Sequence, residues 1–381
     1  MKKLMILAAA AVMTLAACAK IETSSVNEDL NVPITFSTYT PRVIAKADTD
    51  YYVDGTTHAN LIDGTTFGVF AWAVAQTSAT PWSNGTFFQG TGTPGFMADI
   101  PVTFHGDTAG DEGDANVSAA GYYSTGNPIQ YWPSGDTPDG LSFFAYYPAD
   151  VDMPATGLGA KSFTVELAAE DQIDFMVAPV VADQWYDHTN GTGDGTVDFT
   201  FKHTLTKVKF IFKTDNTDAN TTVTLTNAQL VDVYKTNTLT TSYAAGASAN
   251  AGTFSYNWGT ASAAQGFDVT VDGATPSATN VVLSTSNSTC TLADEFLMVP
   301  QTIADNTQKI TLTWEVTTNG VTTENTKVID LYDILTSTDD NITWAKNSQV
   351  TYTITIGPKP IYFTAAVDAW DSVINGAISV N

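Results

Sequence analysis

The chain has 381 residues, of which 43% are hydrophobic and only 14% are charged, so it can bury a core and is not a disordered polyanion. Its 40 acidic and 15 basic residues give a net charge of −25, and such a surface repels phosphate backbones. We therefore expect no nucleic-acid partner, and the length allows two domains.

The first seventeen residues predict a lipoprotein signal peptide. Two lysines precede an apolar run over residues 4–12, which is shorter than the roughly 20 residues needed to cross a bilayer. Leu15 and two alanines at 16–17 then lead to Cys18. This stretch resembles the lipobox of bacterial lipoproteins, which implies cleavage before Cys18 and acylation of its thiol. The alternative is an ordinary signal peptide with a chance cysteine at its border. If Cys18 is acylated, Cys290 has no partner for an intrachain disulfide.

Short strands are predicted for most of the remaining chain. Alternation of Val, Ile, Thr and aromatic residues, interrupted by clusters of Gly, Asn, Asp and Pro, is typical of antiparallel strands. In chain order it occurs over residues 32–38, 67–74, 141–148, 197–203, 207–214, 221–233, 309–318 and 349–357. Helical periodicity is not sustained over three turns anywhere. We therefore predict an all-β fold built from antiparallel β-sandwiches.

The Gly- and Asn-rich loop over residues 187–196 is the best candidate for a domain boundary in the middle of the chain. We place the boundary near residue 195, which gives a first domain over residues 43–195 and a second over residues 196–381. A second Gly- and Asp-rich stretch, residues 105–116, is interpreted as a surface loop.

Motifs for catalysis and metal binding are scarce. The loop carries Asp107, Asp111, Glu112 and Asp114, which are oxygen donors of the kind calcium needs, but their spacing does not match an EF-hand. The four histidines are far apart, and no nucleophile elbow, P-loop or C-x-x-C motif occurs. We expect no enzyme activity, no cofactor and no metal, with calcium at the loop left open.

Arg42 is the one arginine among the fifteen basic residues. It lies 24 residues after Cys18, in a stretch where a protease could reach extended backbone. Pro41 before it narrows the proteases that could cut there. A protease specific for arginine would find a single target in the chain. The alternative is incidental loss of arginine in an acidic protein.

Several segments, in this order, resemble the fimbrillin family, the subunits of type V pili. They are the lipobox at Cys18 and the sequences ITFSTYTPR (34–42), FGVFAW (67–72), YWP (131–133), LSFFAYYP (141–148), DFMVAP (174–179), FKHTLTKVKFIFK (201–213) and YTITIGPKPIYFTAAVDAW (352–370). The resemblance implies two transthyretin-like β-sandwich domains in a lipoprotein precursor that is carried to the outer membrane.

The resemblance also implies a mechanism of assembly. An arginine-specific protease cuts between Arg42 and Val43, although an alanine is common after the arginine in the family, and so removes the propeptide over residues 18–42. The discarded segment includes a temporary strand with Val32, Ile34 and Phe36. The groove that it leaves accepts the C-terminal strand of another pilin subunit, which places the polymer in a cell-surface fimbrium.

Two apolar alternating runs near the C-terminus are candidates for this donor strand. The residues are Ile361, Phe363 and Val367 in the first run and Ile374, Ile378 and Val380 in the second. Alternatively, both runs are the last strands of the second sandwich of the same chain.

A competing hypothesis is a monomeric surface lipoprotein that binds glycans through exposed tryptophans. The eight tryptophans lie mostly in predicted strands, so we expect most of them in the core.

Overall fold

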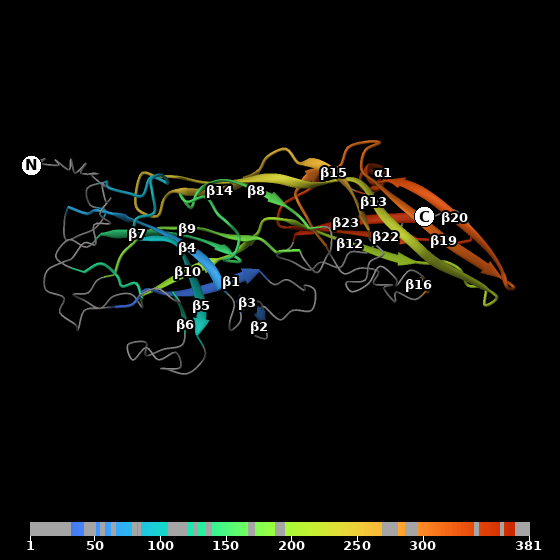
Figure 1. Ribbon diagram of the computed structural model, residues 1–381, viewed down its shortest axis with the longest axis horizontal. Helices are drawn as coiled ribbons and strands as arrows, with labels where there is room; N and C mark the ends of the chain where they lie inside the picture. The colour runs from blue at the N-terminus through green and yellow to red at the C-terminus, as the bar shows by residue number, and fades with distance from the viewer. Residues whose placement is uncertain are drawn as a thin grey trace, which may run out of the picture.

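The computed structural model is elongated, with one group of strands toward each end (Figure 1). It describes residues 32–41, 51–53, 58–61, 66–77, 82, 85–105, 121–124, 129–134, 139–166, 172–186, 195–268, 281–285, 296–338, 343–358 and 362–369. Within these ranges the chain is nearly all β, and the single helix is α1 (Leu331–Thr338). No helix in these ranges is long and apolar enough to cross a membrane. The predicted all-β class is confirmed.

The first group of strands is a ten-stranded sheet, counted over the described residues. Its strands are β1 (Thr35–Pro41), β2 (Tyr51–Val53), β3 (His58–Leu61), β4 (Thr66–Val74), β5 (Met97–His105), β6 (Gly121–Ser124), β7 (Gly140–Tyr147), β9 (Met176–Gln184), β10 (Thr196–Thr200) and β11 (Lys202–His203). They follow the order β11-β9-β7-β4-β5-β6-β1-β3-β2, and β10 pairs with β1.

The remaining strands form two larger sheets and one small one among the described residues, and β8 (Gly159–Thr164) and β14 (Thr253–Trp258) of these strands lie beside the ten-stranded sheet (Figure 1). A four-stranded sheet has the order β17 (Phe296–Met298), β12 (Thr206–Lys213), β22 (Ser348–Thr355) and β23 (Tyr362–Ala369). A seven-stranded sheet has the order β14, β13 (Thr221–Ala244), β19 (Lys309–Thr318) and β20 (Val321–Asp330), with β8, β15 (Ser262–Asp268) and β16 (Val281–Val282) also on β13. Strands β18 (Gln301–Thr302) and β21 (Thr343–Trp344) pair with each other.

Strand β4 separates two hydrophobic clusters, as its alternation predicts. Phe67 and Val69 point into one cluster, together with Ile34 and Phe36 of β1. Phe70 points into the other, which β4 shares with β13 and β14. Because both faces of the central strands are covered, every residue of β7 is buried.

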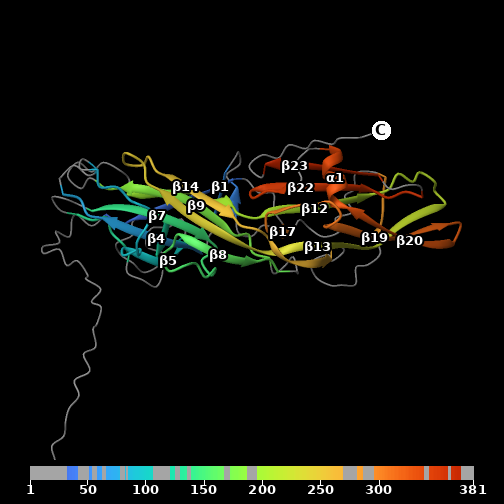
Figure 2. The ribbon, with the colours of Figure 1, turned by 90° about the horizontal axis from the view of Figure 1, so that it is seen from above.

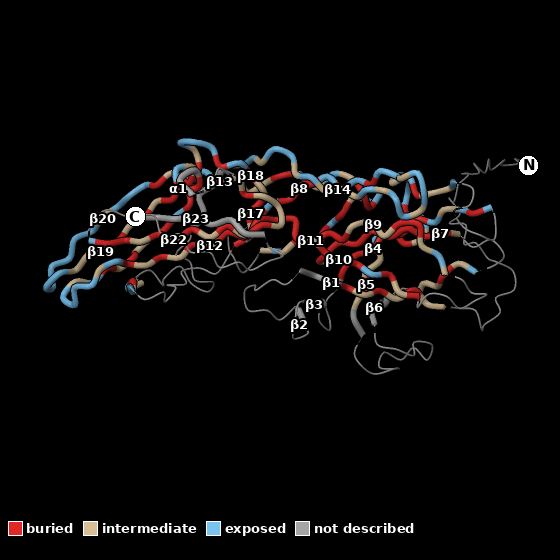
Figure 3. Tube along the Cα trace, turned by 180° about the vertical axis from the view of Figure 1, so that it is seen from behind, coloured by how far each residue is buried: buried red, intermediate tan, exposed pale blue. Residues whose placement is uncertain are grey.

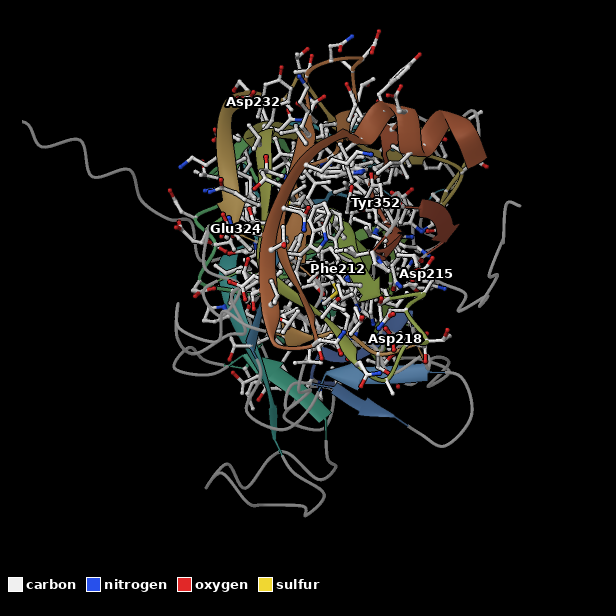
Figure 4. The ribbon with its side chains drawn as sticks, turned by 90° about the vertical axis from the view of Figure 1, so that its right-hand side faces the viewer. Phe212, Asp215, Asp218, Asp232, Glu324 and Tyr352 are labelled. Carbon is white, nitrogen blue, oxygen red and sulfur yellow. The ribbon has the colours of Figure 1, made fainter. Side chains whose placement is uncertain are left out.

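The second half is a sandwich whose core lies between the four-stranded sheet and the first part of β13 with β19. Figure 4 looks along the long axis into this half, with Phe212 and Tyr352 inside it and Asp215, Asp218 and Asp232 near its margins. The ring centroids of Phe210 and Tyr352, from the parallel pair β12 and β22, are 4.9 Å apart. The sandwich architecture is therefore confirmed in both halves.

Strand β13 connects the two halves because it is 24 residues long. Its first part pairs with β19, and its last part lies between β8 and β14 (Figure 2). Its pairing shifts register between Leu230 and Val233, where Asp232 has a φ of 58°. Such a bulge bends a strand, so the same strand can serve two cores.

The predicted boundary near residue 195 does not coincide with a boundary between sheets. Strands β10 and β11 follow this position, yet they pair with β1 and β9 in the ten-stranded sheet. In addition, β14 and the last part of β13 cover that sheet from outside. The division into two domains at residue 195 stays a prediction.

Candidate functional site

Strand β1 has backbone partners along both of its edges. On one edge it pairs in parallel with β10, from Thr35 opposite Thr196 to Tyr39 opposite Thr200. On the other edge it pairs antiparallel with β6 and then β3. Just before the strand, the Ile34 N–H donates to the Gln130 carbonyl at 2.8 Å. The strand is therefore an inner strand of the sheet, although it stands at the start of the described chain.

The apolar side chains of β1 and the residues before it enter the core. Ile34 and Phe36 are 2% and 3% exposed. The Phe36 ring stacks on Phe199 of β10 with centroids 5.5 Å apart, and it meets Phe67 and Phe143 edge-on at 6.2 and 6.0 Å. These rings define an aromatic pocket, which we name the Phe36 pocket and which consists of Phe67, Phe143 and Phe199.

The alternate side chains of β1 face outward and pair with β10. The Ser37 hydroxyl donates to the Asp198 carboxylate. The Thr35 and Thr196 hydroxyl groups are 2.8 Å apart and share a hydrogen bond. Strand β1 therefore matches β10 in register on both faces, with apolar groups inside and hydroxyl groups outside.

Gly195 and Trp132 close the groove around the start of β1. The Gly195 carbonyl accepts from the Trp132 indole N–H at 2.9 Å and from the Thr35 N–H at 3.2 Å. Gly195 has a φ of +78°, and a Cβ there would lie 3.0 Å from Cγ1 of Val32. A side chain at this position would be strained and would press on the N-terminal segment.

The structure brings together only part of the predicted site residues. Val32, Ile34 and Phe36 lie side by side in the first core, with Val32 half-buried. Phe363 and Val367 belong to β23, where their backbones pair with Ile354 and Val350 of β22. This pairing is the arrangement that the alternative interpretation of the first C-terminal run describes.

The remaining predicted site residues fall outside the described ranges. They are Cys18, Arg42, Val43, Ile361, Ile374, Ile378 and Val380. The acidic loop with Asp107 and Asp114 is also outside these ranges, and no group of three metal-ligating side chains occurs within them.

The sequence did not predict which residues surround β1. It predicted a strand over residues 197–203 and singled out the segment with Trp132, but it assigned no partner to either. Phe199 and Gly195 carry no signal of their own, because strand alternation identifies a face and not a neighbour.

The tryptophans behave mostly as core residues. Trp72, Trp132, Trp314 and Trp344 are buried, and Trp185 is 37% exposed. Within the described residues, no other tryptophan is as exposed. Chemically, the arrangement offers a groove that holds an extended apolar strand.

Comparisons with known proteins identify a family and several relatives. A model of a fimbrillin-like family matches residues 54–370. The chain is 29% identical over 214 residues to the fimbrium subunit Fim1C of Phocaeicola vulgatus, a match that covers 52% of this chain and 48% of that protein. The chain thus spans about half the length of this curated relative.

Two solved structures are similar over most of their length. One is a fimbrial protein from Bacteroides vulgatus, with 20% identity, a TM-score of 0.48 and coverage of 80% of this chain and 92% of that chain. The other is a candidate cell adhesion protein from Bacteroides uniformis, with 18% identity, a TM-score of 0.48 and coverage of 89% and 98%.

Proposed function

The chain belongs to the fimbrillin-like family. We therefore propose that it is a structural subunit of a cell-surface fimbrium and has no catalytic role. We further propose that its copies polymerise by exchanging strands. The observation that carries this proposal is the position of β1. An N-terminal strand fills an inner position of the first sheet, and the lone arginine of the sequence follows its last residue, Pro41.

Removal of β1 would create an acceptor site in one step. A cut after Arg42 separates the strand from the rest of the chain. The edge of β10 and the Phe36 pocket would then lack their partner, and such an open edge beside apolar rings favours binding of another strand. The occupied state described by the structure thus represents the precursor in this proposal.

The anchor and the donor complete the mechanism. Acylation of Cys18 would hold the precursor at the outer membrane until an arginine-specific protease cuts between Arg42 and Val43. The donor would come from the C-terminal runs, with Ile361, Phe363 and Val367 or with Ile374, Ile378 and Val380. Head-to-tail insertion leaves a free groove at one end, so the contact propagates into a fibre.

N-terminal sequencing of the protein from cells and from sheared filaments tests this proposal. We expect the filament subunit to begin at Val43, and an Arg42→Ala variant to accumulate as an uncleaved monomer. Arg42→Lys tests the specificity for arginine, and Lys46→Ala is a matched control that should assemble normally. Normal filaments built from subunits that begin at Cys18 would contradict the proposal.

A further inference from the structure

Two hexapeptides near opposite ends of the chain share one pattern. Residues 33–38 read PITFST, and residues 360–365 read PIYFTA. The proline, the isoleucine and the phenylalanine recur at the same spacing, and Ser37 corresponds to Thr364. The first hexapeptide contains the buried residues Ile34 and Phe36, and the last four residues of the second are the start of β23.

Each shared position has a defined task in the groove. The isoleucine and the phenylalanine supply the buried side chains, as Ile34 and Phe36 do. A hydroxyl group follows, where Ser37 donates to Asp198. At the next position Thr38 is buried, and Ala365 would enter there without a polar group to satisfy. The second hexapeptide therefore meets the requirements of the site.

Building on the proposed function, we infer that the strand which replaces β1 comes from a second copy of this chain and that residues 360–365 take the register of residues 33–38. Phe363 enters the Phe36 pocket, Thr364 lies opposite Asp198, and the incoming strand runs parallel to β10. The same sequence supplies both groove and donor, so the chain can form a homopolymer.

The backbone neighbours of the donor strand differ between the two positions. Within the described residues, β23 pairs along one edge with β22 and is the last strand of its sheet. A strand in the β1 position has β10 on one edge and β6 and β3 on the other. Moving from an edge to an inner position therefore gives the donor strand neighbours along both edges, where β23 has only β22 among the described residues.

The last apolar run fits the same groove less well. Residues 374–380 read INGAISV, and aligning Ser379 with Ser37 places Ile378 in the Phe36 pocket and Gly376 at the position of Ile34. This register leaves one buried position without a side chain and the pocket without an aromatic ring. The Phe36 pocket therefore discriminates in favour of Phe363.

Crosslinking between two differently tagged copies of the full chain tests the register. One copy carries Thr364→Cys and the other Asp198→Cys, both are co-expressed, and sheared filaments are treated with a short bifunctional maleimide. Neighbouring strands bring the two positions within reach of each other. A second pairing, Ser379→Cys with Asp198→Cys, represents the competing register. Each single variant beside an unaltered copy controls for crosslinks through Cys290.

We expect a crosslinked dimer that carries both tags from the 364 and 198 pair and not from the 379 and 198 pair. The reverse result would overturn the register and leave the proposed strand exchange intact. Filaments that form without either crosslink would contradict insertion of a C-terminal strand into this groove and therefore the proposed function as well.

A pair of side-chain variants gives a second test. Phe363→Ala should weaken subunit association by about 100-fold or more, because it removes a buried aromatic ring. Tyr362→Ala changes the neighbouring position, which corresponds to the outward-facing Thr35, and should leave association within a few-fold of the original. Thermal unfolding of the uncleaved monomers checks that both variants fold. Equal association of the two variants would overturn the assignment of Phe363.

Discussion

Phe36 anchors the N-terminal strand through three aromatic rings. In the uncleaved precursor, Phe36→Ala should lower the free energy of unfolding by about 3–5 kcal/mol, because it leaves a cavity in a closely packed core. Ser37→Ala is the matched control, since Ser37 faces outward and its loss should reduce stability by less than about 1 kcal/mol. Urea denaturation measures both, and similar losses would contradict the assignment of Phe36 as the anchor.

Gly195 allows a second test at the level of one residue, because Gly320 provides a natural control. Both have positive φ values, of 78° and 80°, but a Cβ at Gly320 would meet nothing within 4 Å. Gly320→Ala should therefore lower stability by about 1–2 kcal/mol through backbone strain alone. Gly195→Ala should lower it further, because the new Cβ also presses on Val32.

This additional loss should disappear once the N-terminal segment is removed. Denaturation curves of both glycine variants, before and after cleavage at Arg42, measure it. If the extra loss at Gly195 persists in the cleaved protein, the contact with Val32 is not its cause.

The buried hydroxyl group of Tyr146 should make the stability of the protein depend on pH in the alkaline range. Burial, and the hydrogen bond that its hydroxyl donates to Asp99 at 2.5 Å, raise the pKa of Tyr146 above the ordinary value of about 10. Because the folded pKa exceeds the unfolded pKa, this stabilisation is fully present below about pH 10. It is lost as the pH rises from there toward the folded pKa.

Tyr146→Phe should therefore flatten the fall in stability above about pH 10.5, by about 1.4 kcal/mol per pH unit. A smaller slope should remain, because burial also raises the pKa of Tyr352. Unfolding free energies measured between pH 8 and pH 11.5 test this, and an unchanged slope would show that the Tyr146 phenol does not titrate with unfolding.

At the scale of elements, the sequence predicts strands and faces better than partners. Alternation identified β4 and β12, and the residues that point inward are those expected, such as Val208, Phe210 and Phe212. Partners were not predictable, because β10 pairs in parallel with a strand about 160 residues away and hydrophobic alternation carries no information on such distant pairing. The helix α1 was missed because its eight residues make about two turns.

Strand β20 is a strand that hydrophobic alternation does not predict. Its alternation is weak, and most of its residues are exposed at one end of the molecule, where it pairs with β19 through a tight turn at Asn319 and Gly320 (Figure 3). The turn, with both residues at positive φ, helps to hold β20 in register with β19, although β20 itself buries almost no side chain. Turn chemistry, which is local, therefore compensates for missing hydrophobic pattern.

Removal of β1 as a unit should have a larger effect than any single substitution within it. A protein that begins at Val43 should bind a hydrophobic dye such as ANS and unfold at lower urea concentration than the precursor, because the pocket and the edge of β10 lose their cover. A protein that begins at residue 32 keeps the strand and is the control. If both bind the dye equally, β1 does not cover the groove in solution.

At the scale of the whole molecule, β13 places groove and donor on one continuous scaffold. Its first part packs in the core shared with β22, and its last part covers the sheet that contains β1. A pull applied between an occupied groove and a donated C-terminal strand would therefore act across two sheets that both pack against β13. This continuity suits a subunit that transmits tension along a fibre.

The net negative charge of the chain should influence how fast such a fibre grows. The full chain has a net charge of −25, and residues 1–42 hold four basic and three acidic residues, so the cleaved subunit carries −26. Copies of one strongly acidic protein repel each other, and salt screens that repulsion as the Debye length falls from about 30 Å at 0.01 M to about 8 Å at 0.15 M. Raising the salt over this range should therefore speed association of purified subunits, by roughly tenfold.

Light scattering from purified subunits measures the rate, and preformed filaments provide the control. Their disassembly should depend little on salt, because apolar side chains and backbone hydrogen bonds hold the inserted strand. The sign of the salt effect separates two kinds of partner. Assembly that slows as salt rises would indicate attraction between opposite charges, and hence a basic partner protein in place of a second copy of this chain.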